Sequence, residues 1–277
     1  MPTIEINAGT IHFEEFGPKD GRPVVFVHGY MMGGHMWRPL SARLAERGLR
    51  CIVPTWPLGA HPEPLRPGAD RTIRGVAGIV ADTLAALDLQ DVVLVGNDTG
   101  GVVTQLVAVH HPERIGTLVL TSCDAFEHFP PPILQPLIRA ARSKALVRIL
   151  TQAMRIPAVR RKAYAGLAHS DIDALTREWV RPARSNPAIA EDLRHLTLSL
   201  RTEVTTAVAA RLPEFGKPTL IAWSADDVFF PVGDGERLAR IIPQARLEVI
   251  TGARTYSMLD QPDRLADLVS AVAVRTG

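Results

Sequence analysis

The stretch VVLVGNDTGG, residues 92–101, decides the fold of this chain. An apolar run rich in β-branched residues ends at Gly96, and from residue 102 onward apolar side chains recur at helical spacing. This change of period predicts a strand, a very tight turn and a helix. Gly96 and Gly100 flank Asp98, since larger side chains beside so sharp a turn would collide with strand and helix. The turn should therefore present the Asp98 carboxylate at the carboxyl end of a strand, beside the positive end of a helix.

An exposed, oriented carboxylate at this place is a candidate nucleophile or base. The segment resembles the nucleophile elbow of the α/β-hydrolase superfamily, with aspartate where serine is more common. An elbow aspartate resembles the branch of haloalkane dehalogenases, fluoroacetate dehalogenases and epoxide hydrolases. The resemblance implies an α/β fold: a mostly parallel twisted sheet flanked by helices, with an inserted helical cap. It also implies hydrolysis of a small organic substrate of the halide, epoxide or ester class.

The composition is that of an ordinary globular protein. The chain has 277 residues, of which 46% are hydrophobic and 22% charged, and its formal net charge is +2. This balance predicts no nucleic-acid partner, and no apolar run is long enough to span a bilayer, so no membrane partner is expected. Cys51 and Cys123 lie in apolar, strand-like surroundings, which favours buried reduced thiols. With no visible leader, these features predict a cytoplasmic protein without metal or cofactor that acts on a small molecule. The sequence leaves the oligomeric state open between monomer and homodimer.

The order of elements divides the chain into two parts. Strand and helix patterns alternate over residues 1–124 and resume over 214–277, which predicts an α/β-hydrolase core. Residues 125–213, called the cap region below, lack a convincing strand and are expected to form the helical cap. The cap region holds 14 Lys and Arg against 7 Asp and Glu. This charge could steer an anionic substrate, although a solvated basic surface explains it equally well. Helical patterns in the cap region cover 134–154, 157–167, 171–180 and 187–200.

The resemblance also assigns roles to residues outside the elbow. A loop after the strand at 23–27 begins His28-Gly29-Tyr30, and the backbone N–H groups of Tyr30 and Thr99 are expected to form an oxyanion hole. His28 itself is expected to be structural, and Tyr30 is also a possible pocket wall. In the stretch SADDVFFP, residues 224–231, Asp227 matches the acid that orients the catalytic histidine.

Two further residues are candidate auxiliary groups. Asp124 follows a strand, so it should lie at the sheet edge where such folds bind ligands. His61 lies in the proline-rich loop WPLGAHPEP, residues 56–64, which borders the site in relatives. A solvated loop histidine is the alternative interpretation of His61.

The family pattern fails at its histidine. Relatives place the catalytic histidine after the last strand, where residues 252–262 read GARTYSMLDQP and Thr255 occupies its position. No histidine follows His195, so no shift in the alignment supplies one. In the aspartate mechanism that histidine activates water against the enzyme ester, and threonine is far too weak a base to replace it.

Four interpretations therefore stay open at the sequence level. The first is a hydrolase with a displaced base, for which Asp227, Asp124 and His61 are the candidates. The second is a non-hydrolytic lyase, isomerase or cyclase with Asp98 as general base. The third is a ligand-binding pseudo-hydrolase. The fourth is that Thr255 is an introduced substitution that traps an intermediate.

Overall fold

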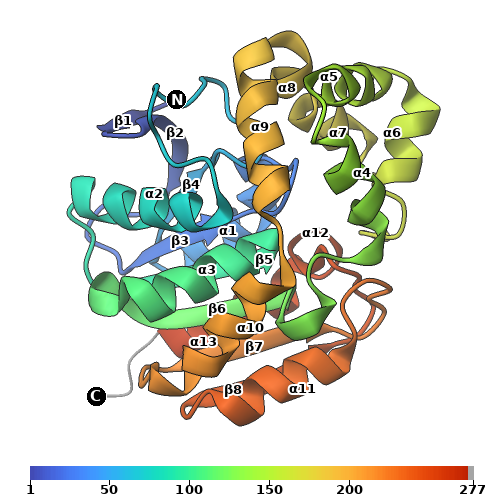
Figure 1. Cartoon of the computed structure of the whole chain (residues 1–277). Coiled ribbons are helices and arrows are strands. Elements are labelled where there is room, and N and C mark those ends of the chain that lie inside the picture. Colours follow the sequence, from blue (N-terminus) through green and yellow to red (C-terminus); the bar gives the residue numbers. More distant parts are fainter. Residues whose placement is uncertain (274–277) are drawn as a thin grey trace.

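A central eight-stranded sheet organises the protein, as seen in a computed structural model that describes residues 1–273 (Figure 1). The strand order is β1-β2-β4-β3-β5-β6-β7-β8. Pairing is antiparallel for β1 with β2 and β2 with β4, and parallel for the other neighbouring pairs. The predicted α/β-hydrolase architecture is confirmed. The strands are β1 Thr3–Ile6, β2 Gly9–Phe16, β3 Pro23–Val27, β4 Arg50–Pro54, β5 Val92–Asp98, β6 Ile115–Cys123, β7 Thr219–Ser224 and β8 Ala245–Ile250.

Helices cover both faces of the sheet. Figure 1 shows α2, α3, α10 and α11 in front of the sheet, and α1 packs with α13 on the other face. These helices are α1 Arg38–Glu46, α2 Ile73–Ala86, α3 Thr99–His110, α10 Thr202–Arg211, α11 Val232–Ile241, the short α12 Ser257–Asp260 and α13 Pro262–Ala273. Five 3₁₀ turns complete the described elements: η1 Gly34–Trp37, η2 Pro112–Arg114, η3 Phe126–His128, η4 Pro132–Leu134 and η5 Leu212–Glu214.

The cap region forms a group of short helices beyond one end of the sheet (Figure 1). The prediction of one helix over residues 134–154 is wrong, because the segment forms two helices separated at residues 141–143. The Ser143 hydroxyl accepts a hydrogen bond from the N–H of Leu146 and so caps the start of the second helix. The last helix, α10, contacts α3 and η3, so it lies with the sheet helices. The others are α4 Gln135–Ala140, α5 Lys144–Ala153, α6 Pro157–Ala163, α7 Asp173–Trp179, α8 Arg181–Ser185 and α9 Pro187–Ser199.

The core lies around the central parallel strands. Every residue of β7, and every residue of β5 before Asp98, is buried, because helices cover both sides of these strands. Trp37 is fully buried against Phe26, with ring centroids 5.0 Å apart. Cys51 and Cys123 are buried and unpaired, as predicted. In residues 1–273, no helix combines the length and the apolar character needed to cross a membrane.

Candidate active site

The elbow places Asp98 between β5 and α3 in a strained backbone conformation. Its φ is 53° and its ψ is −134°, a region that side chains other than glycine rarely occupy. Both flanking glycines are sterically required. A Cβ at Gly96 would lie 2.4 Å from Thr104 Oγ1, and one at Gly100 would lie 2.3 Å from the Val27 carbonyl oxygen. The predicted crowding is therefore present on both sides of the turn.

Two other glycines matter equally, and the sequence pattern did not single them out. A Cβ at Gly29 would lie 2.2 Å from Asp98 Oδ1, so only glycine lets the loop after β3 approach the carboxylate. A Cβ at Gly101 would lie 2.2 Å from the Cβ of Cys123, where α3 passes β6. The first close approach lets the N–H of Tyr30 reach Asp98, and the second lets the start of α3 pack closely against β6.

Two backbone N–H groups hold one oxygen of Asp98. Asp98 Oδ1 accepts hydrogen bonds from the N–H of Thr99 at 2.5 Å and from the N–H of Tyr30 at 3.3 Å. The structure thus brings together the three residues that the sequence assigned to nucleophile and oxyanion hole. Burial raises the pKa of Asp98 to about 6, although these two hydrogen bonds act in the opposite direction. The hydrogen bonds to the Asp98 carboxylate from the described residues all reach Oδ1 and leave Oδ2 without a partner among them.

Asp98 lines a cavity of about 260 Å³ between the sheet and the cap-region helices. Most of the wall is apolar, with leucine, isoleucine, valine, methionine and phenylalanine side chains. None of the described residues that line it is Lys, Arg or His, so the positive charge of the cap region lies outside the cavity. The polar lining residues are Tyr30, Asp98, Thr99, Asp124, Thr151, Tyr164 and Thr197.

Asp124 is a second carboxyl group on the cavity wall. It is 2% exposed, and its Oδ2 accepts a hydrogen bond from Thr99 Oγ1 at 2.9 Å. Its Oδ1 is buried and has no hydrogen-bond partner among the described residues. Burial, reinforced by the negative charge of Asp98, raises the pKa of Asp124 well above its usual range. Thr99 therefore contacts both carboxyl groups, Asp98 through its N–H and Asp124 through its hydroxyl.

Asp227, which is half-buried, and the buried Thr255 are hydrogen-bonded to each other outside the lining of the cavity. Asp227 Oδ1 accepts hydrogen bonds from the N–H groups of Phe229 at 2.8 Å and Phe230 at 3.0 Å, and from Thr255 Oγ1 at 3.1 Å. Asp227 Oδ2 is buried without a partner in the described part of the chain. Burial raises the pKa of Asp227. Neither residue lines the cavity, and Thr255 is fully buried.

Asn97 ties these parts together, and the sequence reasoning missed it. Its Nδ2 donates to the carbonyl oxygens of Thr255 at 2.8 Å, Thr121 at 3.2 Å and Ser122 at 3.2 Å. A single side chain thus joins the elbow to the end of β6 and to the loop after β8. A polar residue directly before Asp98, inside an otherwise apolar strand, was the available signal.

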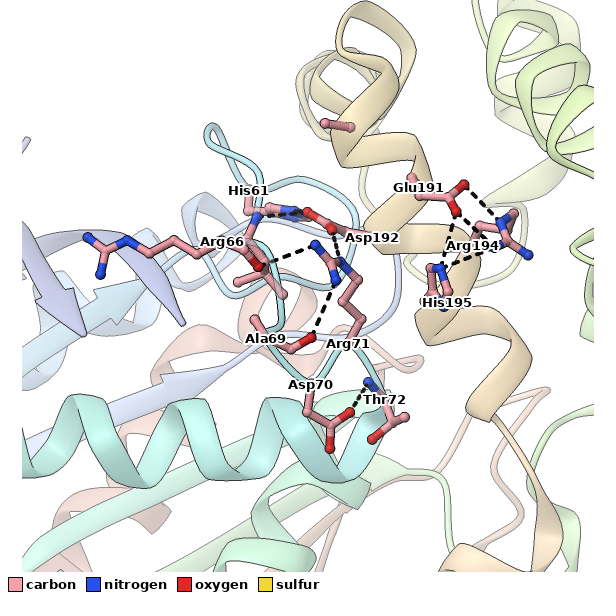
Figure 2. Close-up of polar contacts among 12 residues, drawn as sticks. His61, Arg66, Ala69, Asp70, Arg71, Thr72, Glu191, Asp192, Arg194 and His195 are labelled. Atoms are coloured by element: carbon pink, nitrogen blue, oxygen red, sulfur yellow. Dashed lines mark hydrogen bonds and ion pairs between the residues drawn. The ribbon is translucent and has the colours of Figure 1, made fainter. Parts of the chain in front are cut away.

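His61 lies in a different place from the cavity. Its Nε2 is 3.3 Å from Oδ2 of Asp192 on α9, and both side chains are buried. Figure 2 shows His61 and Arg71, from the loop between β4 and α2, converging on Asp192. The N–H of Leu65 also donates to Asp192 Oδ2 at 2.9 Å. These contacts fasten the cap region to the core, and His61 is not among the residues that line the cavity.

Two tyrosines on the cavity wall also join the core to the cap region. The hydroxyl oxygens of Tyr30 and Thr197 on α9 lie 2.6 Å apart, within hydrogen-bond distance. The Tyr164 hydroxyl donates to the carbonyl oxygen of Met31 at 2.7 Å. Both phenols are buried, and the pKa of each is raised by burial, so they are neutral hydrogen-bonding groups. The role of Tyr164 was missed from the sequence, where only its position as the single tyrosine of the cap region marked it.

His28 is a structural residue of the loop. Its Nδ1 lies 3.0 Å from the carbonyl oxygen of Gly29, and its Nε2 accepts from the N–H of Trp56 at 2.8 Å. Burial lowers its pKa to about 4, so the ring is neutral near pH 7. His28 therefore joins the loop after β3 to the loop after β4.

Comparison with known families agrees with this architecture. The family model described as the alpha/beta hydrolase fold matches residues 22–262, which is most of the chain. The protein belongs to the α/β hydrolase fold family. The match includes the elbow, both loops that carry the backbone donors, the cap region and the stretch around Asp227.

Individual relatives of the α/β-hydrolase are remote and chemically diverse. A cis-3-alkyl-4-alkyloxetan-2-one decarboxylase of Shewanella oneidensis is 27% identical over 94% of this chain and 83% of its own. A 2-hydroxy-6-oxononadienedioate/2-hydroxy-6-oxononatrienedioate hydrolase of Cupriavidus pinatubonensis is 25% identical over 86% of this chain and 82% of its own. The crystal structure of an N-acyl homoserine lactone degrading enzyme, Est816, superimposes with a TM-score of 0.70 at 21% identity, covering 98% of this chain and 99% of the other. The structural likeness supports the fold alone.

Proposed function

We propose that this protein is an α/β-fold hydrolase in which Asp98 attacks an electrophilic carbon of a small, uncharged, largely apolar substrate. The observation that carries the proposal is the arrangement of the Asp98 carboxylate. Two backbone N–H groups hold its Oδ1, and the residue lines an apolar cavity. A carboxylate held by one oxygen keeps the other in position for attack, which is the requirement for covalent catalysis.

The same two N–H groups would serve both chemical steps. In the first step Asp98 Oδ2 forms a bond to carbon, and the leaving atom departs with its electron pair. Oδ1 then becomes the carbonyl oxygen of the enzyme ester, already hydrogen-bonded to the N–H groups of Tyr30 and Thr99. These donors stabilise the negative charge that Oδ1 acquires when water adds to the Asp98 carboxyl carbon. Collapse of that adduct releases the alcohol and regenerates the carboxylate.

Asp124 is the group we propose as acid and base. Thr255 stands at the position that the resemblance assigns to the catalytic histidine, and its hydroxyl is not basic enough to activate water. Of the three candidate replacements, only Asp124 lines the cavity, whereas Asp227 and His61 do not. The raised pKa of Asp124 favours its protonated form, which can give a proton to a leaving oxygen. The resulting carboxylate can then accept a proton from the attacking water, as the acid/base residue of a retaining glycosidase does.

These properties narrow the substrate class. A protonated carboxyl group is useful where the leaving atom is oxygen, as in an epoxide or a strained cyclic ester, and is not needed for a halide. A cavity lined by no cationic side chain among the described residues offers nothing to pair with the carboxylate of a haloacid. A neutral ring with alkyl substituents, the substrate type in the name of the Shewanella relative, suits both features.

Decarboxylation of a β-lactone is a second candidate, and Thr255 is the observation that favours it. Attack of Asp98 at the β-carbon would break the ring C–O bond and leave a free carboxylate. Loss of carbon dioxide with departure of the Asp98 carboxylate would then give an alkene. This second step consumes no water and needs no general base, so a site without an imidazole can perform it. Two relatives, from Shewanella oneidensis and Xanthomonas campestris, are named as cis-3-alkyl-4-alkyloxetan-2-one decarboxylases.

The test combines intact-protein mass with product analysis over a panel of alkyl epoxides, alkyl β-lactones, haloalkanes and haloacids. We expect turnover or an adduct with neutral substrates, lost in Asp98→Ala. Asp124→Asn should slow reaction of the oxygen-leaving substrates by about 10²-fold or more while haloalkane adducts still form. Asp226→Asn, an exposed neighbour of Asp227, is the matched control.

The products separate the two candidates. A diol or hydroxy acid supports hydrolysis, and an alkene with carbon dioxide supports decarboxylation. Products that still form in the Asp98→Ala variant would refute the assignment of Asp98 as the nucleophile. Asp124→Asn with unchanged rates on epoxides and lactones would refute the acid/base assignment alone.

A further inference from the structure

The outer surface around the cavity mouth is apolar. Of the nine exposed large hydrophobic side chains in the described part of the chain, six lie between residues 133 and 159. Three of these also line the cavity, namely Ile133, Leu150 and Val159, which are 58%, 40% and 39% exposed. The cavity therefore opens among these side chains. The other three are Leu146, Ile149 and Ile156, which are 47%, 61% and 54% exposed and do not line the cavity.

The segment that carries these side chains is strongly basic. Residues 128–170 contain eight Lys and Arg and no Asp or Glu. One of the eight, Arg160, is buried and paired with Asp173, and the other seven are exposed. No ion pair is recorded within residues 1–273 for five of these seven, which are Arg139, Arg142, Arg148, Arg155 and Lys162.

Helix α5 displays both properties on one short element. Leu146, Ile149 and Leu150 are spaced three and four residues apart, so they share the exposed face of the helix. Val147 and Thr151 are the buried residues of the opposite side. Of the two cations on α5, Lys144 pairs with Glu191, and Arg148 has no ion pair recorded among residues 1–273. An amphipathic helix with protruding Leu and Ile beside Lys and Arg is typical of elements that lie in a membrane interface.

We propose that the mouth surface, formed by α4, α5, α6 and the segments between them, docks on an anionic lipid surface. Negatively charged headgroups would pair with the free Lys and Arg, and the exposed Leu and Ile would insert among the acyl chains. The cavity would then open toward the apolar phase of the bilayer. This inference does not require the proposed chemistry, although an apolar substrate could enter the cavity directly from that phase.

Charge and shape favour lipid over other occupants. A second copy docked face to face would place two such basic surfaces against each other. To bind a folded acidic protein, this surface would need a rigid groove that receives the side chains of that protein. Instead, its apolar residues protrude around an opening. A fluid bilayer adapts to protrusions, and each Lys or Arg near an anionic surface adds to the attraction.

Vesicle co-sedimentation of the full chain tests the proposal without any substrate. Vesicles of phosphatidylcholine with one third phosphatidylglycerol are compared with pure phosphatidylcholine at about 20 and 500 mM NaCl. We expect binding to the anionic vesicles at low salt, with at least tenfold less binding to the neutral ones and at high salt. Ile149→Ser with Ile156→Ser, and separately Arg148→Glu with Arg155→Glu, should each lower binding at least tenfold.

Each control makes one substitution of the same kind, apolar to serine or cation to glutamate, at a distant site. Val249→Ser removes an exposed apolar side chain on β8, which lies on the opposite side of the molecule from α5 and α6 (Figure 1). Lys19→Glu reverses an exposed charge in a turn near the N-terminus. Neither control should change binding. The proposal is overturned if wild-type protein does not bind anionic vesicles at low salt, if controls and mouth variants lose binding equally, or if the mouth variants abolish a dimer of the wild type without affecting vesicle binding.

Discussion

Replacing Thr255 by histidine tests whether the site lacks only an imidazole. Thr255 donates to Asp227 Oδ1 at 3.1 Å, and Asp227 Oδ2 is buried without a partner in the described residues. A histidine Nδ1–H could bond the same carboxylate, which would stabilise the imidazolium formed when Nε2 takes a proton from water. The backbone contact from Asn97 to residue 255 does not depend on the side chain, so the loop should keep its position.

Thr255→His should speed hydrolysis of the Asp98 ester but lower the stability of the protein. General-base catalysis is worth roughly 10² to 10⁴ in rate, or about 3–5 kcal/mol of barrier. We expect the lower end, about 10²-fold, because Asp124 already supplies a base in our proposal. Thr255 is fully buried, and the larger ring overpacks its surroundings, so the free energy of unfolding should fall by about 1–3 kcal/mol.

The assay is the decay of the Asp98 ester, followed by intact mass after a single-turnover pulse of an alkyl epoxide. Thr255→Asn is the matched control, because an amide can donate to Asp227 but cannot accept the proton. Asp227→Asn in the histidine background should remove most of the gain. A Thr255→His variant that is folded, forms the ester and releases it no faster than wild type would refute the reasoning.

Three further predictions follow from buried charges and close contacts. Because the Asp98 pKa is raised from 3.8 to about 6, kcat/KM should rise with pH through about 6. The free energy of unfolding should fall between about pH 4 and 6, where the unfolded chain has lost the proton that native Asp98 keeps. Asp98→Asn should therefore gain up to about 3 kcal/mol above pH 7 in a denaturant titration, and an unchanged midpoint would contradict this. Asp192→Asn should cost about 1–3 kcal/mol, since His61 and Arg71 lose a buried anion. The half-exposed control Glu191→Gln should cost less than about 1 kcal/mol, and equal losses would contradict the anchor role of the Asp192 contacts drawn in Figure 2. Gly101→Ala should destabilise the protein by about 1–3 kcal/mol because the new Cβ would meet Cys123. Gly78→Ala in α2, which has open space around it, should be neutral or stabilising. Thermal melts that rank the two variants in the opposite order would disprove the steric argument.

The fold was predictable because its signals are local. The apolar run ending at Gly96, the helical period after Gly101 and the alternation of strands and helices each depend on a few neighbouring residues. The break between α4 and α5 was missed because the apolar pattern continues across Ser143, where the backbone is extended and the side chain caps the start of a new helix. The requirement for glycine at positions 29 and 101 comes from close contacts with distant segments, and the hydrophobic periodicity of the sequence does not reveal such contacts.

The sequence by itself determined the elbow, the place of Asp98 in it and the absence of a histidine after β8, because these depend on residue identity along one stretch. Tertiary structure decided which side chains share the cavity with Asp98. It put Asp124 on the cavity wall and gave it Thr99 as a common partner with Asp98, and it sent His61 to Asp192 instead. Which side chains line the cavity depends on how the cap region folds back over the strand ends. The contact between His61 and Asp192 joins residues more than a hundred positions apart, so it is set by the packing of whole elements.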